Sequence, residues 1–171
     1  MSELANLENF TFSREDWTQY RSLERLQQRA GVTREYILPL VIKELLDNAW
    51  DASASIVTLD RTDDGTVIIS DNGPGIDPKQ IARIFSVNRP FESSKLWRLP
   101  TRGALGNGLR VVTGAVMALQ GKLTVITRGN RCRIFPNLET GESLVTLEPT
   151  DETTGTSVEI NISNLETEKH P

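Results

Sequence analysis

The stretch KELLDNAWDA, residues 43–52, decides the fold because it places polar groups and an apolar face on one predicted helix. Apolar side chains recur before and within it at spacings of three and four residues, which predicts a helix that begins near Thr33 or Pro39 and ends near Ala52. The apolar face of such a helix must pack against a second layer of structure. The stretch therefore predicts one layer of a folded domain.

Three polar residues lie on one side of this predicted helix. Glu44, Asn48 and Asp51 follow one another at i, i+4 and i+7, so at about 100° per residue they fall within a wedge of roughly 60°. A carboxylate one turn before a carboxamide suits a nucleotide triphosphate, because Asn48 offers a neutral oxygen to a hard cation and Glu44 can polarise a water molecule. Taken alone, the same spacing is equally typical of a solvated polar stripe on a surface helix.

A second stretch, ISDNGPGID at residues 69–77, combines a carboxylate with two glycines. Asp71 ends a predicted strand, and Gly73 and Gly75 allow backbone conformations that let a flat ligand approach the main chain. An ionised carboxylate only accepts hydrogen bonds, so Asp71 at the mouth of a pocket would select the exocyclic amine of adenine over a keto group. By itself, the stretch is also an ordinary Asp-Asn-Gly turn that closes a strand.

A third stretch, TRGALGNGLR at residues 101–110, is rich in glycine and leads into a predicted helix. Its glycines are Gly103, Gly106 and Gly108. Exposed N–H groups in such a loop and at a helix start form an anion site, which predicts phosphate binding. The spacing matches neither a Walker A loop nor a Rossmann fingerprint, and alone it is also typical of a simple connector.

A fourth stretch, GTSVEI at residues 155–160, places Thr156 at the start of a predicted strand. That strand can lie beside Asp71, where the threonine hydroxyl would hold the carboxylate or a water molecule shared with a bound base. Taken alone, the stretch indicates a strand start and nothing more.

Helical and strand patterns account for the rest of the chain. Ser13 and the acidic residues after it predict the start of a peripheral helix that ends at Ala30, before Gly31. The further predicted helices span residues 78–85 and 109–120, and the predicted strands span residues 56–60, 66–70, 122–128, 131–136, 143–147 and 156–162. The pattern predicts an α/β fold, a two-layer sandwich with helices over a mixed, mostly antiparallel sheet whose C-terminal half is a meander.

Length and composition exclude several classes of protein. The chain has 171 residues, 37% hydrophobic and 25% charged, which is typical of a globular domain and not of a disordered chain. Apolar runs are too short to cross a membrane and no leader sequence is visible, so we expect a cytoplasmic protein. One cysteine, Cys132, and one histidine, His170, provide neither a disulfide nor a zinc cluster, and a net charge of -4 argues against binding nucleic acid without a partner.

Together and in this order, the four stretches resemble the GHKL superfamily of ATPases and kinases, over about residues 34–162. The resemblance implies the Bergerat ATP-binding fold, with ATP and Mg²⁺ bound and slow ATP hydrolysis as the activity. Within the superfamily, Ser94-Lys95 and the run that follows Gly106 are most similar to the topoisomerase VI B-like proteins. A histidine-kinase or anti-sigma-type protein kinase is the alternative, although no phosphoacceptor histidine helix is visible.

The resemblance also implies a role for each matching position. Glu44 is similar to the general base, Asn48 to the magnesium ligand, and Asp71 to the carboxylate that binds adenine. The implied nucleotide contacts are Asn48, Asp51, Asp71, Gly73, Gly75, Ile76, Lys95, Gly103, Ala104, Leu105, Gly106, Asn107, Gly108, Leu109 and Thr156. Within this set, the glycine-rich stretch of residues 101–110 is similar to the lid that covers the phosphates.

The implied organisation is one module of a larger DNA-processing protein. Residues 1–33 are an N-terminal extension with the peripheral helix, residues 34–165 the ATP-binding domain and residues 166–171 a C-terminal tail. The catalytic lysine that topoisomerase VI relatives take from a following transducer domain has no place before Pro171. We therefore expect a partner domain or subunit to supply it, together with any DNA contacts. ATP would operate a conformational switch and can drive homodimerisation, and no membrane partner is expected.

Overall fold

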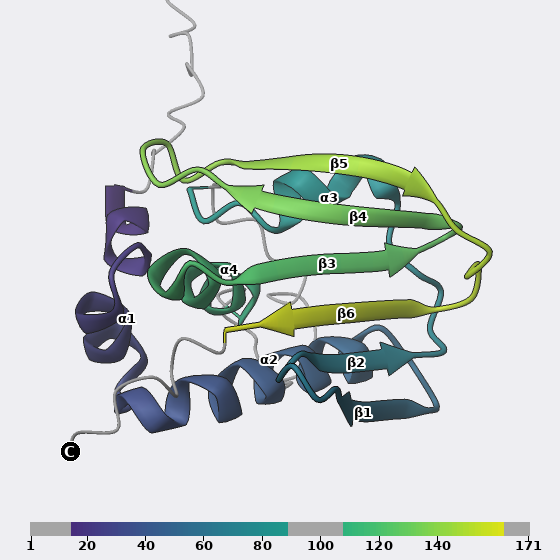
Figure 1. The fold of residues 1–171 in the computed structure, drawn as a ribbon, viewed down its shortest axis with the longest axis horizontal. Helices are drawn as coiled ribbons and strands as arrows, with labels where there is room; N and C mark the ends of the chain where they lie inside the picture. The colour runs from purple at the N-terminus through teal and green to yellow at the C-terminus, as the bar shows by residue number, and fades with distance from the viewer. Residues whose placement is uncertain (1–14, 89–107, 163–171) are drawn as a thin grey trace, which may run out of the picture.

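The computed structural model describes residues 15–88 and 108–162, which form helices and strands in two layers (Figure 1). The helical elements are the 3-10 helices η1 (Glu15–Tyr20) and η2 (Arg34–Tyr36) and the α-helices α1 (Leu23–Ala30), α2 (Ile37–Asp51), α3 (Pro78–Ile84) and α4 (Gly108–Leu119). The strands are β1 (Val57–Arg61), β2 (Val67–Asp71), β3 (Lys122–Thr127), β4 (Asn130–Pro136), β5 (Ser143–Pro149) and β6 (Thr156–Asn161). The prediction of a two-layer α/β sandwich is confirmed.

All six strands form one sheet in the order β1-β2-β6-β3-β4-β5, and every pairing between the described strands is antiparallel. The chain returns across the sheet after β5, so β6 lies between β2 and β3. A C-terminal meander is therefore right only for β3 to β5, and the sheet is not mixed. The register places Asp71 opposite Thr156 and Thr156 opposite Thr127, which brings three polar strand ends to one place.

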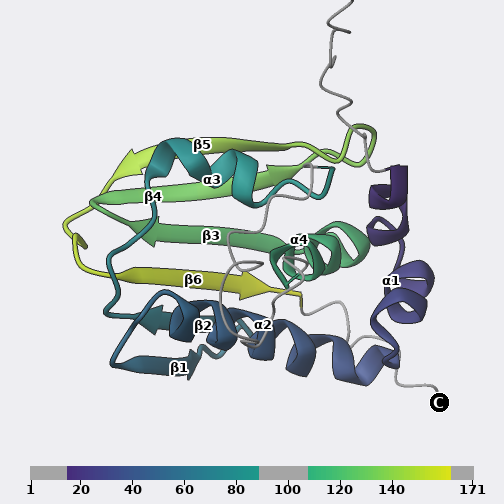
Figure 2. The same ribbon diagram turned by 180° about the vertical axis from the view of Figure 1, so that it is seen from behind.

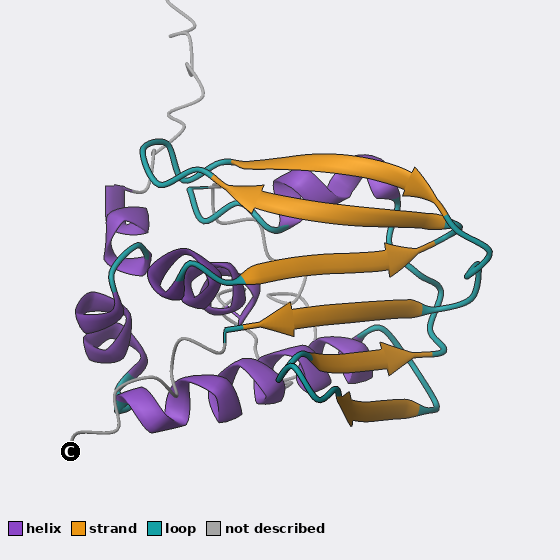
Figure 3. Ribbon diagram, viewed as in Figure 1, coloured by secondary structure: helices purple, strands orange, loops and turns teal. Residues whose placement is uncertain are grey.

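Helices α2, α3 and α4 cover one face of this sheet, as Figures 2 and 3 show. Helix α2 packs over β1 and β2, α3 over β4 and β5, and α4 over β3 and β4. The apolar spacing of α2 explains its orientation, because Ile37, Val41 and Leu45 are all buried in the core between the layers. The layers thereby fix which side of α2 faces the sheet.

The N-terminal helix differs from its prediction. The structure has η1 in place of the first half, a break at Arg21 and Ser22, and then α1; Ser13, the predicted cap, lies outside the described residues. The Ser22 hydroxyl caps α1 by accepting a hydrogen bond from the N–H of Arg25 at 3.4 Å. Tyr20 is buried, and both η1 and α1 pack on α4. This segment is therefore part of the folded core and is not peripheral.

The opposite face of the sheet carries polar residues that pair with one another. Arg131 donates to Glu159 at 3.0 Å, and Arg133 donates to Glu148 at 3.2 Å. The first pair is partly buried and the second is exposed, and pairs at a surface contribute little to stability, which is consistent with a face that contacts water. Within residues 15–88 and 108–162, we find no helix with the length and apolarity that a bilayer span requires.

Candidate functional site

A pocket of about 80 Å³ lies between α2, the first turn of α4 and the strands β2 and β6. Its wall is mainly apolar, with three polar side chains. The lining residues are Leu45, Asn48, Ala49, Ala52, Ile69, Asp71, Gly75, Ile76, Phe85, Leu109, Thr156 and Val158. The structure thus brings together residues from all four of the stretches that the sequence analysis selected.

Asp71 ends β2 at the edge of this pocket, directly opposite Thr156 on β6. Its Oδ1 accepts a hydrogen bond from the N–H of Gly73 at 2.8 Å, which fixes the orientation of the carboxylate. Within the described part of the chain, no residue donates a hydrogen bond to the other oxygen, Oδ2. An ionised carboxylate held in this way offers an acceptor to a ligand in the pocket.

The turn after β2 is held by Thr127, a residue that the sequence analysis missed. Thr127 is buried on β3, and its Oγ1 accepts a hydrogen bond from the N–H of Ile76 at 2.8 Å. The same hydroxyl can donate to the carbonyl oxygen of Ile76 or of Gly155, both at 3.3 Å. Gly75 has a φ of +76°, and a side chain there would meet the Thr127 hydroxyl. Thr127 therefore positions the turn that lines the pocket.

Asn48 reaches the pocket from α2, one turn beyond Glu44. Its amide nitrogen Nδ2 is buried and has no hydrogen-bond partner among the described residues. A buried polar atom without a partner is costly, so the atom indicates that a ligand completes this environment. The two ends of an amide are assigned from their partners, and the same group can present its oxygen to a cation.

The described residues include no cluster of three or more His, Cys, Asp or Glu side chains that could hold a metal ion. The amide oxygen of Asn48 nevertheless fits Mg²⁺, which binds through few protein ligands together with phosphate oxygens.

The carboxylate of Glu44 contacts Gly108, the first residue of α4, and the ammonium group of Lys43. Its Oε2 occupies the space in which a side chain at Gly108 would lie. On the other side, Nζ of Lys43 is 3.4 Å from Oε1 of Glu44 and 2.8 Å from Oδ2 of Asp47. The bond to Asp47 raises the pKa of Lys43, so this cation stays charged beside Glu44. Only 17% of the Glu44 side chain is exposed, and its carboxylate is thus held close to α4.

Other predicted contacts do not meet in the pocket. Gly73 does not line it but orients Asp71, and Gly108 contacts Glu44 instead. Asp51, in the last turn of α2, is not among the lining residues. The remaining predicted contacts lie outside the described residues: Lys95, Gly103, Ala104, Leu105, Gly106 and Asn107.

Of the apolar wall of the pocket, only Ile76 and Leu109 were among the contacts that the sequence analysis named. Ile69 and Val158 stand two residues from Asp71 and Thr156 on the same strands, so strand alternation places each pair on one face. That alternation is a signal that could have identified them. Phe85 carries no such signal, because it follows α3 and reaches the pocket only through the packing of that helix.

The antiparallel sheet, its single layer of helices and the pocket between them define an α/β sandwich with a ligand site. The family profile described as histidine kinase-, DNA gyrase B- and HSP90-like ATPase matches residues 34–165. The chain belongs to this family, which is the GHKL superfamily of ATP-binding domains. ATP hydrolysis is an activity of the ATPases in this family.

The relatives are DNA mismatch repair proteins. MutL from Streptococcus pyogenes serotype M1 and MutL from serotype M5 (strain Manfredo) are each 28% identical over 126 residues, or 70% of this chain and 18% of their own length. An N-terminal domain of a DNA repair protein (24% identity, TM-score 0.45) covers 71% of this chain and 34% of its own. The Aquifex aeolicus MutL ATPase domain complexed with ADP (22% identity, TM-score 0.41) matches over 71% of this chain and 40% of its own chain. Structural likeness at these two TM-scores carries no functional argument. The MutL relatives do not support the topoisomerase VI B-like proteins as the nearer match.

Proposed function

We propose that the chain binds ATP in this pocket and hydrolyses it slowly with Mg²⁺. We further propose that the bound nucleotide operates a conformational switch in a DNA-processing protein. The observation that supports this best is the meeting of Asp71, Thr156 and Asn48 around one apolar pocket. These residues come from separate parts of the sequence, and a solvated stripe or an ordinary turn gives no reason for them to converge.

The pocket suits a flat base that carries an exocyclic amine. Apolar side chains of α2 and β2, Ala49 and Ile69 among them, line it, and Oδ2 of Asp71 can accept a hydrogen bond from the amine of adenine. A keto group in the same position would bring a second acceptor against the carboxylate, so guanine would be rejected. Thr156 lies across from Asp71, where its hydroxyl would hold the carboxylate or a shared water molecule.

Glu44 and Asn48 would act at the triphosphate end. As general base, Glu44 would accept a hydrogen bond from a water molecule and orient it toward the terminal phosphate. Asn48 would hold Mg²⁺ through its amide oxygen, and bound Mg²⁺ neutralises charge on the phosphate oxygens. The N–H groups at the start of α4, from Gly108 onward, are suited to phosphate, as is the side chain of Lys95.

The larger setting is proposed from the relatives and the family. By name, the MutL relatives act in DNA mismatch repair, and a DNA-processing role fits both them and topoisomerase VI. Residues 34–165 would form the ATP-binding domain, preceded by an extension of residues 1–33 and followed by a tail of residues 166–171. A partner domain or subunit would supply a catalytic lysine and the DNA contacts, and ATP would favour a homodimer. Because ATP contacts one conformation better than another, its binding would shift the population.

Calorimetry with ADP and GDP tests the recognition of the base. We expect ADP to bind and GDP not to bind. The substitution Asp71→Asn should weaken ADP binding by about 10- to 100-fold, because a hydrogen bond to a charged group contributes about 1.5 to 3 kcal/mol. Asp77→Asn is the matched control: Asp77 caps α3, where asparagine caps equally well, so the Kd should not change. If the unchanged chain gives no binding heat with any adenine nucleotide, the proposal is wrong.

Phosphate release with Mg²⁺ and ATP tests the chemistry. Glu44→Gln should abolish turnover while ADP binding stays within about two-fold, because the carboxylate is needed as a base and not to hold the purine. Transfer of labelled phosphate from ATP to a protein, in place of release to water, would favour the protein-kinase alternative.

A further inference from the structure

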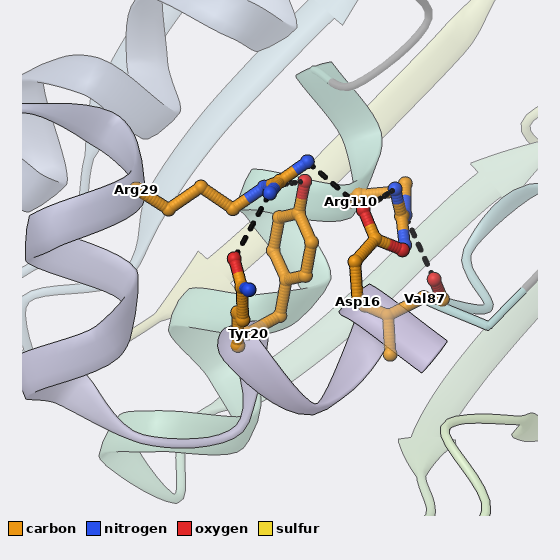
Figure 4. A network of polar contacts seen from close by, with 6 residues as sticks. Asp16, Tyr20, Arg29, Val87 and Arg110 are labelled. Carbon is orange, nitrogen blue, oxygen red and sulfur yellow. Dashed lines mark hydrogen bonds and ion pairs between the residues drawn. The ribbon is translucent and has the colours of Figure 1, made fainter. Parts of the chain in front are cut away.

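Arg110, in the first turn of α4, is a buried cation whose partners include a backbone carbonyl, a carboxylate and an aromatic ring (Figure 4). Only 2% of its side chain is exposed. Its Nε donates to the carbonyl oxygen of Val87 at 2.7 Å, and its two terminal nitrogens donate to the carboxylate of Asp16 at 3.0 and 3.4 Å. The guanidinium also lies over the ring of Tyr20, 4.6 Å from the ring centre. One side chain therefore connects α4, η1 and the segment after α3.

Asp16 has a second cation, on the side away from α4. Arg29 of α1 donates to Oδ2 of Asp16 at 3.0 Å and to the Tyr20 hydroxyl at 2.7 Å (Figure 4). Asp16 thus joins α1 to α4 through two separate arginines. The two contacts can be removed one at a time, because Arg29 lies on α1 and Arg110 on α4.

The pair is partly buried, because 2% of the Arg110 side chain and 26% of the Asp16 side chain are exposed, and such a pair is a poor way to gain stability. Removing charges from water costs about as much as their attraction returns, and apolar residues of similar size do as well or better. Breaking such a pair from one side is destabilising, because the remaining charge is buried without its partner. The pair between Asp16 and Arg110 is therefore better explained by the geometry that it imposes on α4.

That geometry acts directly on the proposed base. Gly108, two residues before Arg110 on α4, leaves the space that the Glu44 carboxylate occupies. Val87, the other partner of Arg110, is itself fixed because its N–H donates to the carbonyl oxygen of Gly141 at 2.9 Å. The contacts of Arg110 hence set where the first turn of α4 lies relative to Glu44.

We infer that Asp16 is a positioning residue for the proposed ATP hydrolysis: through Arg110 it holds the first turn of α4 against Glu44. This inference rests on the proposed function, and it assigns the N-terminal segment a part in the phosphate end of the site. The adenine end, at Asp71 and Thr156, is built from strands that the ion pair does not touch. The pocket wall includes Leu109 from the first turn of α4, so losing Asp16 should affect the triphosphate more strongly than the base.

The test compares Asp16→Asn with Arg29→Gln in the 171-residue chain. For Asp16→Asn we expect turnover per folded molecule to fall about ten-fold or more, because a small displacement of reacting groups costs one to two orders of magnitude. The preference for the ATP analogue AMP-PNP over ADP should shrink by a similar factor, while the Kd for ADP stays within about two-fold. Arg29→Gln removes the ion pair between Asp16 and Arg29. It should leave the turnover, the preference for AMP-PNP and the Kd for ADP unchanged.

Hydrogen exchange adds a measurement that does not depend on nucleotide. Amides of residues 112–115, which donate to the carbonyls of the first turn of α4, should exchange faster in Asp16→Asn and at an unchanged rate in Arg29→Gln. If Asp16→Asn does not fold, the double variant Asp16→Leu with Arg110→Met removes both charges and keeps apolar packing, and it should show the same losses. If the unchanged chain binds adenine nucleotides but Asp16→Asn behaves like Arg29→Gln, this inference alone is overturned. If the unchanged chain binds none, the proposed function fails first and the inference falls with it.

Discussion

Replacing Thr127 by valine removes the hydroxyl that holds the turn lining the pocket, while keeping the shape of the side chain. In the structure this hydroxyl accepts a hydrogen bond from the N–H of Ile76 at 2.8 Å. It lies 3.3 Å from the carbonyl oxygens of Ile76 and Gly155. Valine can neither accept nor donate, so the N–H of Ile76 would lose its partner in a partly buried place. The turn formed by Gly75 and Ile76 would then lose the side-chain hydrogen bond that ties it to β3.

The magnitude follows from that lost acceptor. A buried donor left without a partner costs about 1 to 3 kcal/mol, whereas the methyl group that replaces the hydroxyl fits the same volume. For a chain of this length, each kcal/mol lowers the melting temperature by roughly 2 to 4 °C. Because Gly75 and Ile76 line the pocket, ADP affinity should also fall, by several-fold.

Thermal unfolding followed by circular dichroism, together with calorimetry of ADP binding, provides the assay. Thr124→Val is the matched control, because Thr124 lies on the same strand with its side chain on the opposite face of the sheet. That substitution should change the free energy of unfolding by no more than about 0.5 kcal/mol. Equal effects of the two substitutions on stability and on ADP binding would refute the role assigned to Thr127.

Two further predictions concern glycines. Gly108→Ala should leave the free energy of unfolding within about 0.5 kcal/mol, because only the end of the flexible Glu44 side chain must move, yet it should lower ATP turnover about ten-fold or more in a phosphate-release assay. Gly155→Ala should lower the free energy of unfolding by more than about 3 kcal/mol in urea titrations, because its φ is +69° and the added methyl would overlap the backbone carbonyl of Asp71. Gly31→Ala, at φ +68° in open space, should cost only about 1 kcal/mol, and a similar loss at both glycines would contradict the overlap.

The local elements could be predicted from the sequence because their signals are local. Helical spacing located α2, and β-branched runs between turn residues located all six strands. The sequence analysis placed β6 beside the end of β2, but its pairing with β3 has no local signal, since the pairing of distant strands depends on the packing of the whole sheet. For the same reason the extended helix predicted from Ser13 was wrong: burial of Tyr20 against α4 interrupts it, and Ser22 provides the cap.

The residues of the candidate site also differ in whether the sequence could predict them. Glu44 and Asn48 could be placed together because helix geometry fixes residues four apart. Thr127 could not be selected, since a buried threonine on a strand is ordinary until its partner is known. The ion pair of Asp16 and Arg110 joins residues 94 positions apart, and nothing near either residue in the sequence indicates the other. Contacts of this kind follow only from the tertiary structure.

The glycines of the site are not all explained by the backbone conformations that only glycine adopts. Gly75 needs a positive φ, but Gly73 and Gly108 do not; each is instead packed against a proposed functional carboxylate. A methyl group at Gly73 would stand 2.9 Å from Oδ1 of Asp71, and one at Gly108 would overlap Oε2 of Glu44. Since a carboxylate must keep a fixed position to select a base or orient water, the neighbouring residue can have no side chain. Glycine at these two positions is therefore a requirement for space, set by the acid beside it.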